Sequence, residues 1–394
     1  MASCKKVLML CGDYMEDYEA AVPFYALAAF GVAVDCVAPG KKPPGDACLT
    51  AVHEFLGHDL YTELPGHRFA VTADFAAAAA ADASRYDALV VPGGRFVERL
   101  SVDPLAVSLV AAFAGEGETA TRRRPVVVTC HSQLLLAAAG AMRGVRCTAF
   151  FSMRRVVELA GGTWVEPDPL GLCVADGNVL SAIGWPAHGE IIRELLRAMG
   201  ARVAGGRGQA VLFLCAVPLS LSRRHYVDDY EANVPFRALA GVGCRVEAAC
   251  PTKRKGEACV TAIYDATPAA ASDERRGHNF AVTADWGDVD ADRYACVVVP
   301  GGRAPELLAT RGEAVALVRE FAGKGKVVAS IDQGHLLLAA AGLLDGRSCA
   351  SGVATSVRHG GAVADGKLVT AASWPDLAEF IAHIISLLGI TVSF

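Results

Sequence analysis

One cysteine, Cys130, stands where a nucleophile would be placed. It follows the apolar run PVVVT and precedes the Leu- and Ala-rich run LLLAAAG, which predicts a strand, a sharp turn and then a helix. Unpaired N–H groups and the helix dipole at such a turn would stabilise a thiolate and lower the cysteine pKa. The alternative is that Cys130 is one more small buried residue, which is the common fate of cysteines in a reducing compartment.

An acidic residue and a pair of glycines are predicted to reach the same edge of the sheet. Glu19, in DYEAAVP, comes just after the first predicted strand, and Gly93 and Gly94 end another strand in PGGR. A charged Glu19 would raise the pKa of the thiol, so we expect it to be protonated beside Cys130. Glycine N–H groups could stabilise a developing oxyanion. A solvated helix terminus and an ordinary tight turn are the alternatives for these two segments.

The chain repeats itself over almost its whole length. Five motifs return in the same order, so the sequence indicates a duplicated domain rather than chance similarity. A Gly-rich stretch at 204–209 is typical of a linker, and we expect one domain over 1–203 and a second over 210–394. The repeated segments are EDYEAAVPF and DDYEANVPF, GHRFAVTAD and GHNFAVTAD, RYDALVVPGGR and RYACVVVPGGR, LLLAAAG twice, and VADGNVLSAIGWP and VADGKLVTAASWP.

Within each copy, strand-like and helix-like segments alternate. DALVVPGG and PVVVTC are continuous apolar runs, as expected for strands that are buried on both faces of a parallel sheet. VADGN and VADGK indicate hairpins with a DG turn. The sequence therefore predicts an α/β protein of two tandem flavodoxin-like, three-layer sandwich domains. Ligands of such folds bind at the carboxyl ends of the strands.

These motifs together resemble the DJ-1/PfpI superfamily, whose fold is similar to that of class I glutamine amidotransferases. The likeness rests on Glu-x-x-x-Pro after the first strand, on PGGR, and on Cys-His at the elbow. The tandem arrangement resembles the duplicated plant DJ-1 proteins of the D type. The resemblance implies that Cys130 is the nucleophile, that Glu19 is its acidic partner and that His131 is the histidine following it.

Three further residues receive expectations from this comparison. Ser132 stands where the family usually has glycine, which would restrict the backbone of the turn and place a hydroxyl near the pocket. Glu98 matches a PfpI-type glutamate that can engage a histidine of a neighbouring subunit. His188, in WPAHGE, is expected near the rim, where it could line the pocket, and Glu379 or a neighbour is expected at its position in the second copy.

The second copy lacks the thiol. Alignment through LLLAAAG places Asp332 and Gln333 at the positions of Cys130 and His131, while Glu231 is retained. His335 aligns with Gln133, inside the helix, and cannot replace the lost histidine. Two carboxylates would then lie together and one should hold a proton. We expect a degenerate site that serves structure or assembly.

The resemblance implies a glutathione-independent glyoxalase of type III, which turns methylglyoxal into lactate and glyoxal into glycolate in carbonyl and oxidative stress defence. Related activities in the family are named lactoylglutathione lyase and deglycase. A second hypothesis is a non-enzymatic redox-sensing stress protein or chaperone, since an accessible thiolate is easily oxidised. The third is a PfpI-like cysteine peptidase or amidase. Adjacent residues seldom face each other at a turn, so its histidine could come from another subunit.

The bulk properties exclude several classes. A net charge of -5, with no basic run longer than Arg122–Arg124, disfavours nucleic acid. The apolar segment after Lys6 is too short for a signal peptide, and no run could span a membrane, so we expect a cytoplasmic protein, with the nucleus as a second location.

The thirteen cysteines show no zinc-site spacing. We expect no metal and no cofactor, a small 2-oxoaldehyde substrate, and a homo-oligomer that could be a trimer of tandem chains. His67 and His278, present in both copies, are interpreted as structural or interfacial.

Overall fold

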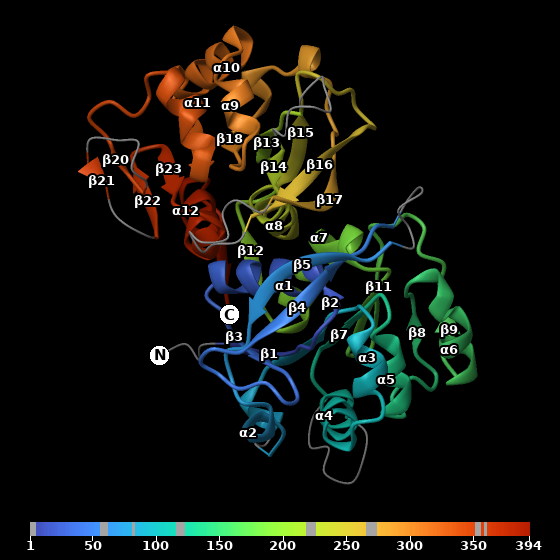
Figure 1. Cartoon of the computed structure of the whole chain (residues 1–394). Coiled ribbons are helices and arrows are strands. Elements are labelled where there is room, and N and C mark those ends of the chain that lie inside the picture. Colours follow the sequence, from blue (N-terminus) through green and yellow to red (C-terminus); the bar gives the residue numbers. More distant parts are fainter. Residues whose placement is uncertain are drawn as a thin grey trace. The chain divides into compact units, whose positions relative to one another are not determined.

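The computed structural model describes residues 5–55, 62–80, 83–115, 123–217, 226–264, 274–350, 356–357 and 361–394 (Figure 1). The chain divides into two compact units. The first comprises Met1–Arg202 with Val392–Phe394, and the second comprises Val203–Thr391. The short strand β12 (Arg202–Ala204) and the stretch expected to be a linker lie where the division falls. Each unit is described by itself.

The first unit is built on a six-stranded sheet in the order β10-β11-β7-β6-β1-β3. All neighbours are parallel except the hairpin of β10 and β11, which the DG turn predicted. Every residue of β6 and β7 is buried, because helices cover both faces of the sheet. The strands are β1 (Lys6–Leu10), β3 (Ala33–Val37), β6 (Ala88–Val91), β7 (Val126–Thr129), β10 (Cys173–Asp176) and β11 (Val179–Ala182).

The helices of the first unit form two groups. One group packs α1 against α7, and the other brings α3, α4 and α6 against α5. The sheet and these two layers give the three-layer sandwich that the sequence predicted. The helices are α1 (Asp17–Ala29), α2 (Phe75–Ala80), α3 (Phe96–Leu100), α4 (Pro104–Ala114), α5 (Gln133–Ala138), α6 (Arg154–Leu159) and α7 (His188–Ala198).

The second unit repeats this architecture. Its six-stranded sheet has the order β15-β13-β18-β19-β23-β22, which is the same arrangement as in the first unit. The strands are β13 (Ala210–Leu214), β15 (Arg245–Ala249), β18 (Cys296–Val299), β19 (Val327–Ile331), β22 (Ala362–Asp365) and β23 (Leu368–Ala371). The helices are α8 (Asp229–Gly241), α9 (Ala304–Leu308), α10 (Gly312–Gly323), α11 (His335–Ala340) and α12 (Leu377–Leu387).

Shorter strands complete both units. The first contains β2 (Met15–Glu16), β4 (Ala47–Val52) and β5 (Leu64–Ala70) as a small sheet, with β8 (Arg146–Cys147) paired to β9 (Thr163–Trp164). The second contains β14 (Val227–Asp228), β16 (Ala258–Ile263) and β17 (Arg275–Ala281), with β20 (Ser348–Cys349) paired to β21 (Ser356–Val357). Strand β24 (Thr391–Ser393) ends the chain. No described helix is long and apolar enough to cross a membrane.

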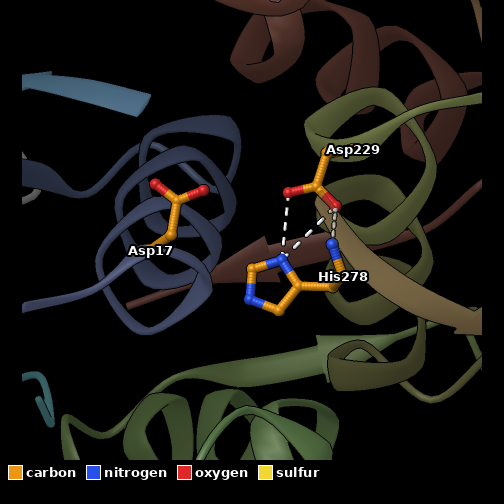
Figure 2. A group of neighbouring side chains, drawn as sticks. All are labelled: Asp17, Asp229 and His278. Atoms are coloured by element: carbon orange, nitrogen blue, oxygen red, sulfur yellow. Dashed lines mark hydrogen bonds and ion pairs between the residues drawn. The ribbon is translucent and has the colours of Figure 1, made fainter. Parts of the chain in front are cut away.

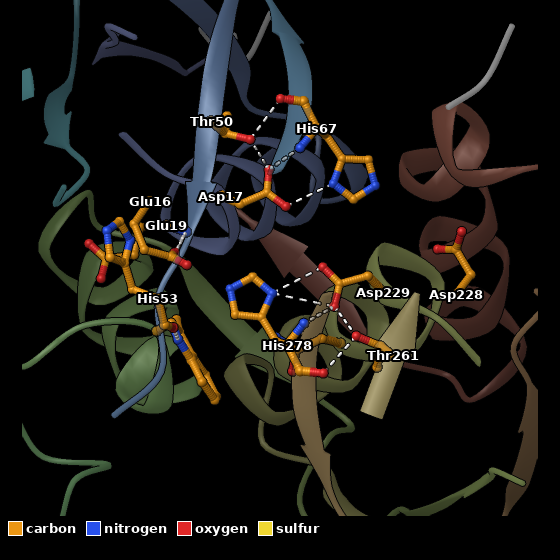
Figure 3. A network of polar contacts seen from close by, with 12 residues as sticks. Glu16, Asp17, Glu19, Thr50, His53, His67, Asp228, Asp229, Thr261 and His278 are labelled. Atoms are coloured by element: carbon orange, nitrogen blue, oxygen red, sulfur yellow. Dashed lines mark hydrogen bonds and ion pairs between the residues drawn. The ribbon is translucent and has the colours of Figure 1, made fainter. Parts of the chain in front are cut away.

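A buried aspartate–histidine pair fixes the start of α1 to the β4–β5 hairpin. The carboxylate of Asp17 contacts His67 Nδ1 at 2.7 Å and accepts the hydroxyl of Thr50 at 2.5 Å (Figure 3). The second unit repeats the arrangement, with Asp229 in contact with His278 Nδ1 at 3.0 Å (Figure 2). These contacts support the structural interpretation of the two histidines, because each one holds a helix terminus in place within its own unit.

Candidate active site

The predicted elbow is present in the first unit. Cys130 follows β7 directly and has a φ of 56°, in the left-handed region that L-residues seldom adopt. Its N–H donates to the carbonyl of Ala182, and its own carbonyl accepts from Phe150 N–H, both at 3.1 Å. The neighbouring strand and the segment after α5 therefore hold the strained residue in place from two sides.

Ser132 stabilises the turn rather than restricting it, which corrects one expectation. Its φ of -69° is ordinary helical backbone, so the special conformation falls on Cys130 and a glycine is not required at 132. The buried Ser132 hydroxyl accepts from Thr129 N–H at 2.6 Å and donates to Thr129 O at 2.7 Å. These bonds close the loop internally, and Ser132 is not among the residues that line the cavity.

Glu19 lies in the first turn of α1 and is fully buried behind the elbow. Its Oε2 accepts Gly93 N–H at 2.6 Å and the Thr129 hydroxyl at 2.5 Å. Burial, with a smaller contribution from the neighbouring Glu16, raises the pKa of Glu19 to about 8. Glu19 is therefore largely protonated at neutral pH, as the sequence predicted, and its negative charge develops beside the sulfur only as the pH rises to about 8 and above.

Gly93 lies at the closest approach of these groups. A Cβ at this position would stand 2.3 Å from the Cys130 Cβ and 2.7 Å from Glu19 Oε2, so no side chain fits. The N–H of Gly93 is occupied by Glu19, which rules it out as the expected oxyanion donor. The backbone N–H groups of Gly94 and His131 face the Cys130 sulfur instead and act to lower its pKa. These two amides are the donors available to an oxyanion there.

The expectation of a low cysteine pKa was wrong. Burial, then the neighbouring Glu19 and Glu16, raise the pKa of the Cys130 thiol well above its ordinary value. The helix that follows, α5, has only six residues, and the sulfur is almost wholly removed from water, with 4% of the residue exposed. Desolvation of a thiolate outweighs the stabilisation by a short helix dipole. The resting group is a neutral thiol that needs a base.

His131 can supply that base, contrary to the expectation that adjacent residues would not face each other. Its Nδ1 lies 3.1 Å from Cys130 Sγ, because the left-handed backbone at Cys130 turns the sulfur toward the next side chain. The ring stacks on Phe150 at 5.2 Å between centroids, and Nε2 lies 3.3 Å from the Ser152 hydroxyl. Burial lowers the pKa of His131, so the ring is neutral and able to accept a proton at pH 7.

A cavity of about 270 Å³ opens onto the sulfur. Glu98, one of the predicted residues, lies on its wall beside Arg95, whose guanidinium binds Glu63 through two nitrogens. His188 is buried as the first residue of α7 and is not part of this wall. At the matching position the second unit has Leu377, a near neighbour of Glu379, as the first residue of α12. The lining residues are His53, Glu54, Phe55, Thr62, Glu63, Gly94, Arg95, Glu98, Cys130, His131, Phe150 and Ser152.

Three residues around the site were not singled out from the sequence. Thr129, Phe150 and Ser152 contact the Glu19–Cys130–His131 group, yet they lie in segments whose composition is ordinary for strands and loops. Thr129 could have been found from its position, since the last residue of a parallel strand faces the same edge as the elbow. Phe150 and Ser152 come from the chain after α5, and only the three-dimensional fold shows where that segment returns.

The second unit keeps the shape of the elbow without the thiol. Asp332 has a φ of 49°, and its Oδ2 accepts Gly302 N–H at 3.3 Å. Glu231 accepts Gly301 N–H at 2.9 Å, and burial together with nearby Asp228 and Asp332 raises its pKa well above the ordinary value. The predicted pair of carboxyl groups, one of them protonated, is therefore present. Gln333 follows Asp332, and His335 lies buried with its Nδ1 2.9 Å from Ser330 Oγ.

Among the described residues, neither unit by itself brings together three His, Cys, Asp or Glu side chains with their ligand atoms within 4.8 Å of one another. The Cys130 cavity offers a thiol, an imidazole, carboxyl groups and backbone amides for chemistry.

Comparison with known proteins places this geometry in a family. The chain is 46% identical to DJ-1 protein homolog E of Arabidopsis thaliana, over 99% of this chain and 98% of that protein. It is 43% identical to Protein DJ-1 homolog D of the same plant, over the full length of both. Deglycase PfpI of Pyrococcus furiosus is 31% identical and matches 45% of this chain and 89% of its own length. The family model described as DJ-1/PfpI family matches residues 5–198 and again 219–387, so the chain belongs to the DJ-1/PfpI family and carries its domain twice.

Proposed function

We propose that the first unit is a glutathione-independent glyoxalase that converts methylglyoxal to lactate and glyoxal to glycolate. The observation that carries the proposal is the contact of 3.1 Å between Cys130 Sγ and His131 Nδ1, two residues that line the cavity. This pair couples a nucleophile to a base, and the N–H groups of Gly94 and His131 stand ready for a developing oxyanion. A cavity of about 270 Å³ accommodates a small 2-oxoaldehyde.

The proposed conversion balances in atoms and electrons without a metal or a second thiol. As Sγ attacks the aldehyde carbon, its proton passes to His131 and the carbonyl oxygen becomes the hydroxyl of a hemithioacetal. A proton then moves from C1 to C2 through an enediol, which leaves a thioester of the 2-hydroxy acid on the sulfur. Water hydrolyses the thioester to the acid and restores the Cys130 thiol.

His131, rather than Glu19, is the base that we assign to these proton transfers. His131 lines the cavity and is neutral near pH 7, whereas Glu19 lies behind Gly93 and holds its own proton. Glu19 contributes by remaining uncharged next to Cys130 and by fixing Gly93 through the bond at 2.6 Å. A charged carboxylate in its place would oppose formation of the thiolate.

Deglycation is the second candidate, and the names of the archaeal relatives favour it. Proteins named deglycase from Pyrococcus furiosus and Pyrococcus abyssi match the domain at 31% and 30% identity. In an adduct of a 2-oxoaldehyde with an amine or thiol, C1 carries a hydroxyl and the added group in place of the aldehyde carbonyl. Cys130 Sγ would displace that group from C1, and the amine or thiol would leave with the proton of the Cys130 thiol. The resulting hemithioacetal would then follow the same remaining steps to the hydroxy acid. The two reactions share the site and differ in whether free aldehyde is bound.

The redox-sensor and peptidase hypotheses are weaker. A sensor needs an exposed thiolate, whereas Cys130 is buried and its pKa is raised. A peptidase needs room for an extended chain on both sides of the nucleophile, and the cavity is walled by Phe55, Phe150 and the Arg95–Glu63 pair. Selective oxidation of Cys130 by mild peroxide, with no turnover of aldehydes, would reverse this ranking.

The test measures lactate formed from methylglyoxal with no glutathione present. We expect turnover by the whole chain, loss of at least a hundredfold in Cys130→Ala, and full activity in Cys173→Ala, a cysteine of β10 outside the cavity. A Cys130→Ala protein with undiminished turnover would contradict the proposal. To separate the two candidates, the aldehyde is first allowed to react with an amine. A deglycase releases the amine from this adduct faster than the adduct dissociates without the protein.

Assembly and location remain predictions. We propose a homo-oligomer, with a trimer of tandem chains as the specific arrangement, by analogy with PfpI-like rings, and a cytoplasmic location with the nucleus as a second site. Light scattering of the purified chain and imaging of a tagged chain test these two points.

A further inference from the structure

The side chain of Ser152 has no role in the chemistry described so far, yet it occupies a distinctive place. It follows Phe150 in the segment after α5 and stands on the wall of the cavity, exposed to solvent. Its hydroxyl lies 3.3 Å from Nε2 of His131, while Nδ1 of the same ring lies 3.1 Å from Cys130 Sγ. The three side chains therefore form a continuous chain of polar contacts from the buried sulfur to the open cavity.

The imidazole in the middle is held in one orientation. Phe150 stacks on the ring with an angle of 28° between planes and 5.2 Å between centroids, which prevents it from turning away from the sulfur. With the ring fixed, its two nitrogens have fixed partners, one thiol and one hydroxyl. What remains variable is the position of the protons.

The raised thiol pKa decides how these protons are arranged. Cys130 is a neutral thiol at rest, so its S–H can donate to a neighbouring acceptor. Nδ1 must therefore be unprotonated to receive the sulfur's proton, which places the hydrogen of the neutral ring on Nε2. That hydrogen can be accepted by the Ser152 hydroxyl, which lies 3.3 Å from Nε2 in the described part of the chain. After the transfer the imidazolium donates from both nitrogens, and the same hydroxyl accepts again.

We infer that Ser152 is a positioning residue that selects the Nε2–H tautomer of His131 and stabilises the imidazolium formed when Cys130 loses its proton. Being exposed, Ser152 can also exchange that proton with water. This role deepens the proposed function, since it acts through the Cys130–His131 pair. The hydrogen bond contributes about 1 kcal/mol, which corresponds to a change of roughly fivefold in the population of the reactive pair.

The test follows the Cys130–His131 pair directly and uses no substrate. The rate at which iodoacetamide alkylates Cys130 is measured from pH 5 to 10 on the whole chain, by mass spectrometry of the Cys130 peptide. In this reaction a carbon–sulfur bond forms, iodide leaves and the thiol proton passes to His131. Ser152→Ala should slow alkylation of Cys130 about fivefold at pH 7 and should change how the alkylation rate depends on pH. Ser152→Thr keeps the hydroxyl and should retain the rate.

A matched control and an independent readout complete the experiment. Ser108→Ala removes an exposed serine of α4 that is not part of the cavity, and its profile should equal that of the parent chain. Nitrogen NMR of labelled histidine reports the tautomer of His131, which should shift toward Nδ1–H in Ser152→Ala. An unchanged labelling profile together with an unchanged tautomer in Ser152→Ala would overturn the inference. A chain that shows no activity toward methylglyoxal would contradict the proposed function, but it would not change the meaning of the alkylation and NMR results.

Discussion

Replacing Asp332 by asparagine should stabilise the second unit. A Cβ on Gly301 would lie 2.4 Å from Glu231 Oε2 and 2.8 Å from Asp332 Oδ2, so these two oxygens can be no more than the sum of the distances, 5.2 Å, apart. Two full charges at about 5 Å repel by about 3 kcal/mol at an effective dielectric constant of about 20. The protein avoids the repulsion by keeping Glu231 protonated, which itself costs free energy at neutral pH.

The expected gain is smaller than the full repulsion. Asp332 is only partly buried, so water screens its charge, and we expect the free energy of unfolding to rise by about 1–2 kcal/mol at pH 7. Asparagine tolerates the left-handed backbone and keeps an oxygen for Gly302 N–H. Its amide can also donate to Glu231.

The direction in which the free energy of unfolding changes with pH follows from proton binding. The pKa values of Glu231 and Asp332 are both raised in the folded state, so the folded chain holds protons that the unfolded chain has released above about pH 4. Stability therefore falls as pH rises from there, and the advantage of Asp332→Asn should grow over the same range and vanish near pH 3.

The assay is urea unfolding from pH 3 to 8, with hydrogen exchange of β18 and β19 peptides to identify the transition of the second unit. The two units need not unfold together, so a single midpoint would be ambiguous. Asp288→Asn is the matched control, an exposed carboxylate of the same unit, and should leave stability unchanged at every pH. A gain that is absent, or that does not depend on pH, would refute the reasoning.

Three other changes give distinct outcomes in the first unit. Ser132→Ala leaves the buried N–H of Thr129 without its acceptor and should cost about 1–3 kcal/mol of unfolding free energy, measured by urea titration. Because the pKa of Glu19 is raised to about 8, the unit should lose stability as pH rises from about 4 to 8, and alkylation of Cys130 should rise less steeply above pH 8 than that of a free thiol. Gly184→Ala places a Cβ 2.5 Å from Glu19 Oε1 at a φ of 150°, and should lower both the melting temperature and the turnover of methylglyoxal.

The sequence predicts the fold well because its signals are local and occur twice. Continuous apolar runs became β6 and β7, and the DG turns became hairpins in both units. The proximity of Cys130 and Glu19 also follows from their positions in the sequence, because parallel strands end at a common edge.

The electrostatics of the site were harder to predict. A strand–turn–helix pattern indicated a helix dipole that lowers the cysteine pKa. The pattern does not show that α5 has only six residues or that only 4% of Cys130 is exposed. Nor does it show that Gly93 N–H is already bound by Glu19. Burial and hydrogen-bond partners depend on segments far away in the chain, and these terms set the pKa.

A comparison of the two elbows distinguishes the features that the fold determines from those that the chemistry requires. Cys130 and Asp332 share a left-handed φ, at a cost of about 1–2 kcal/mol for a residue with a Cβ, although only one of them carries a thiol. The strained backbone is therefore a property of the strand-to-helix connection, and its maintenance needs no nucleophile. In the first unit the same strain turns Cys130 Sγ to within 3.1 Å of His131 Nδ1, which is the contact that gives a raised-pKa thiol its base. In the second unit Gln333 stands at the place of His131 and cannot act as a base, so restoring the cysteine alone should not restore turnover.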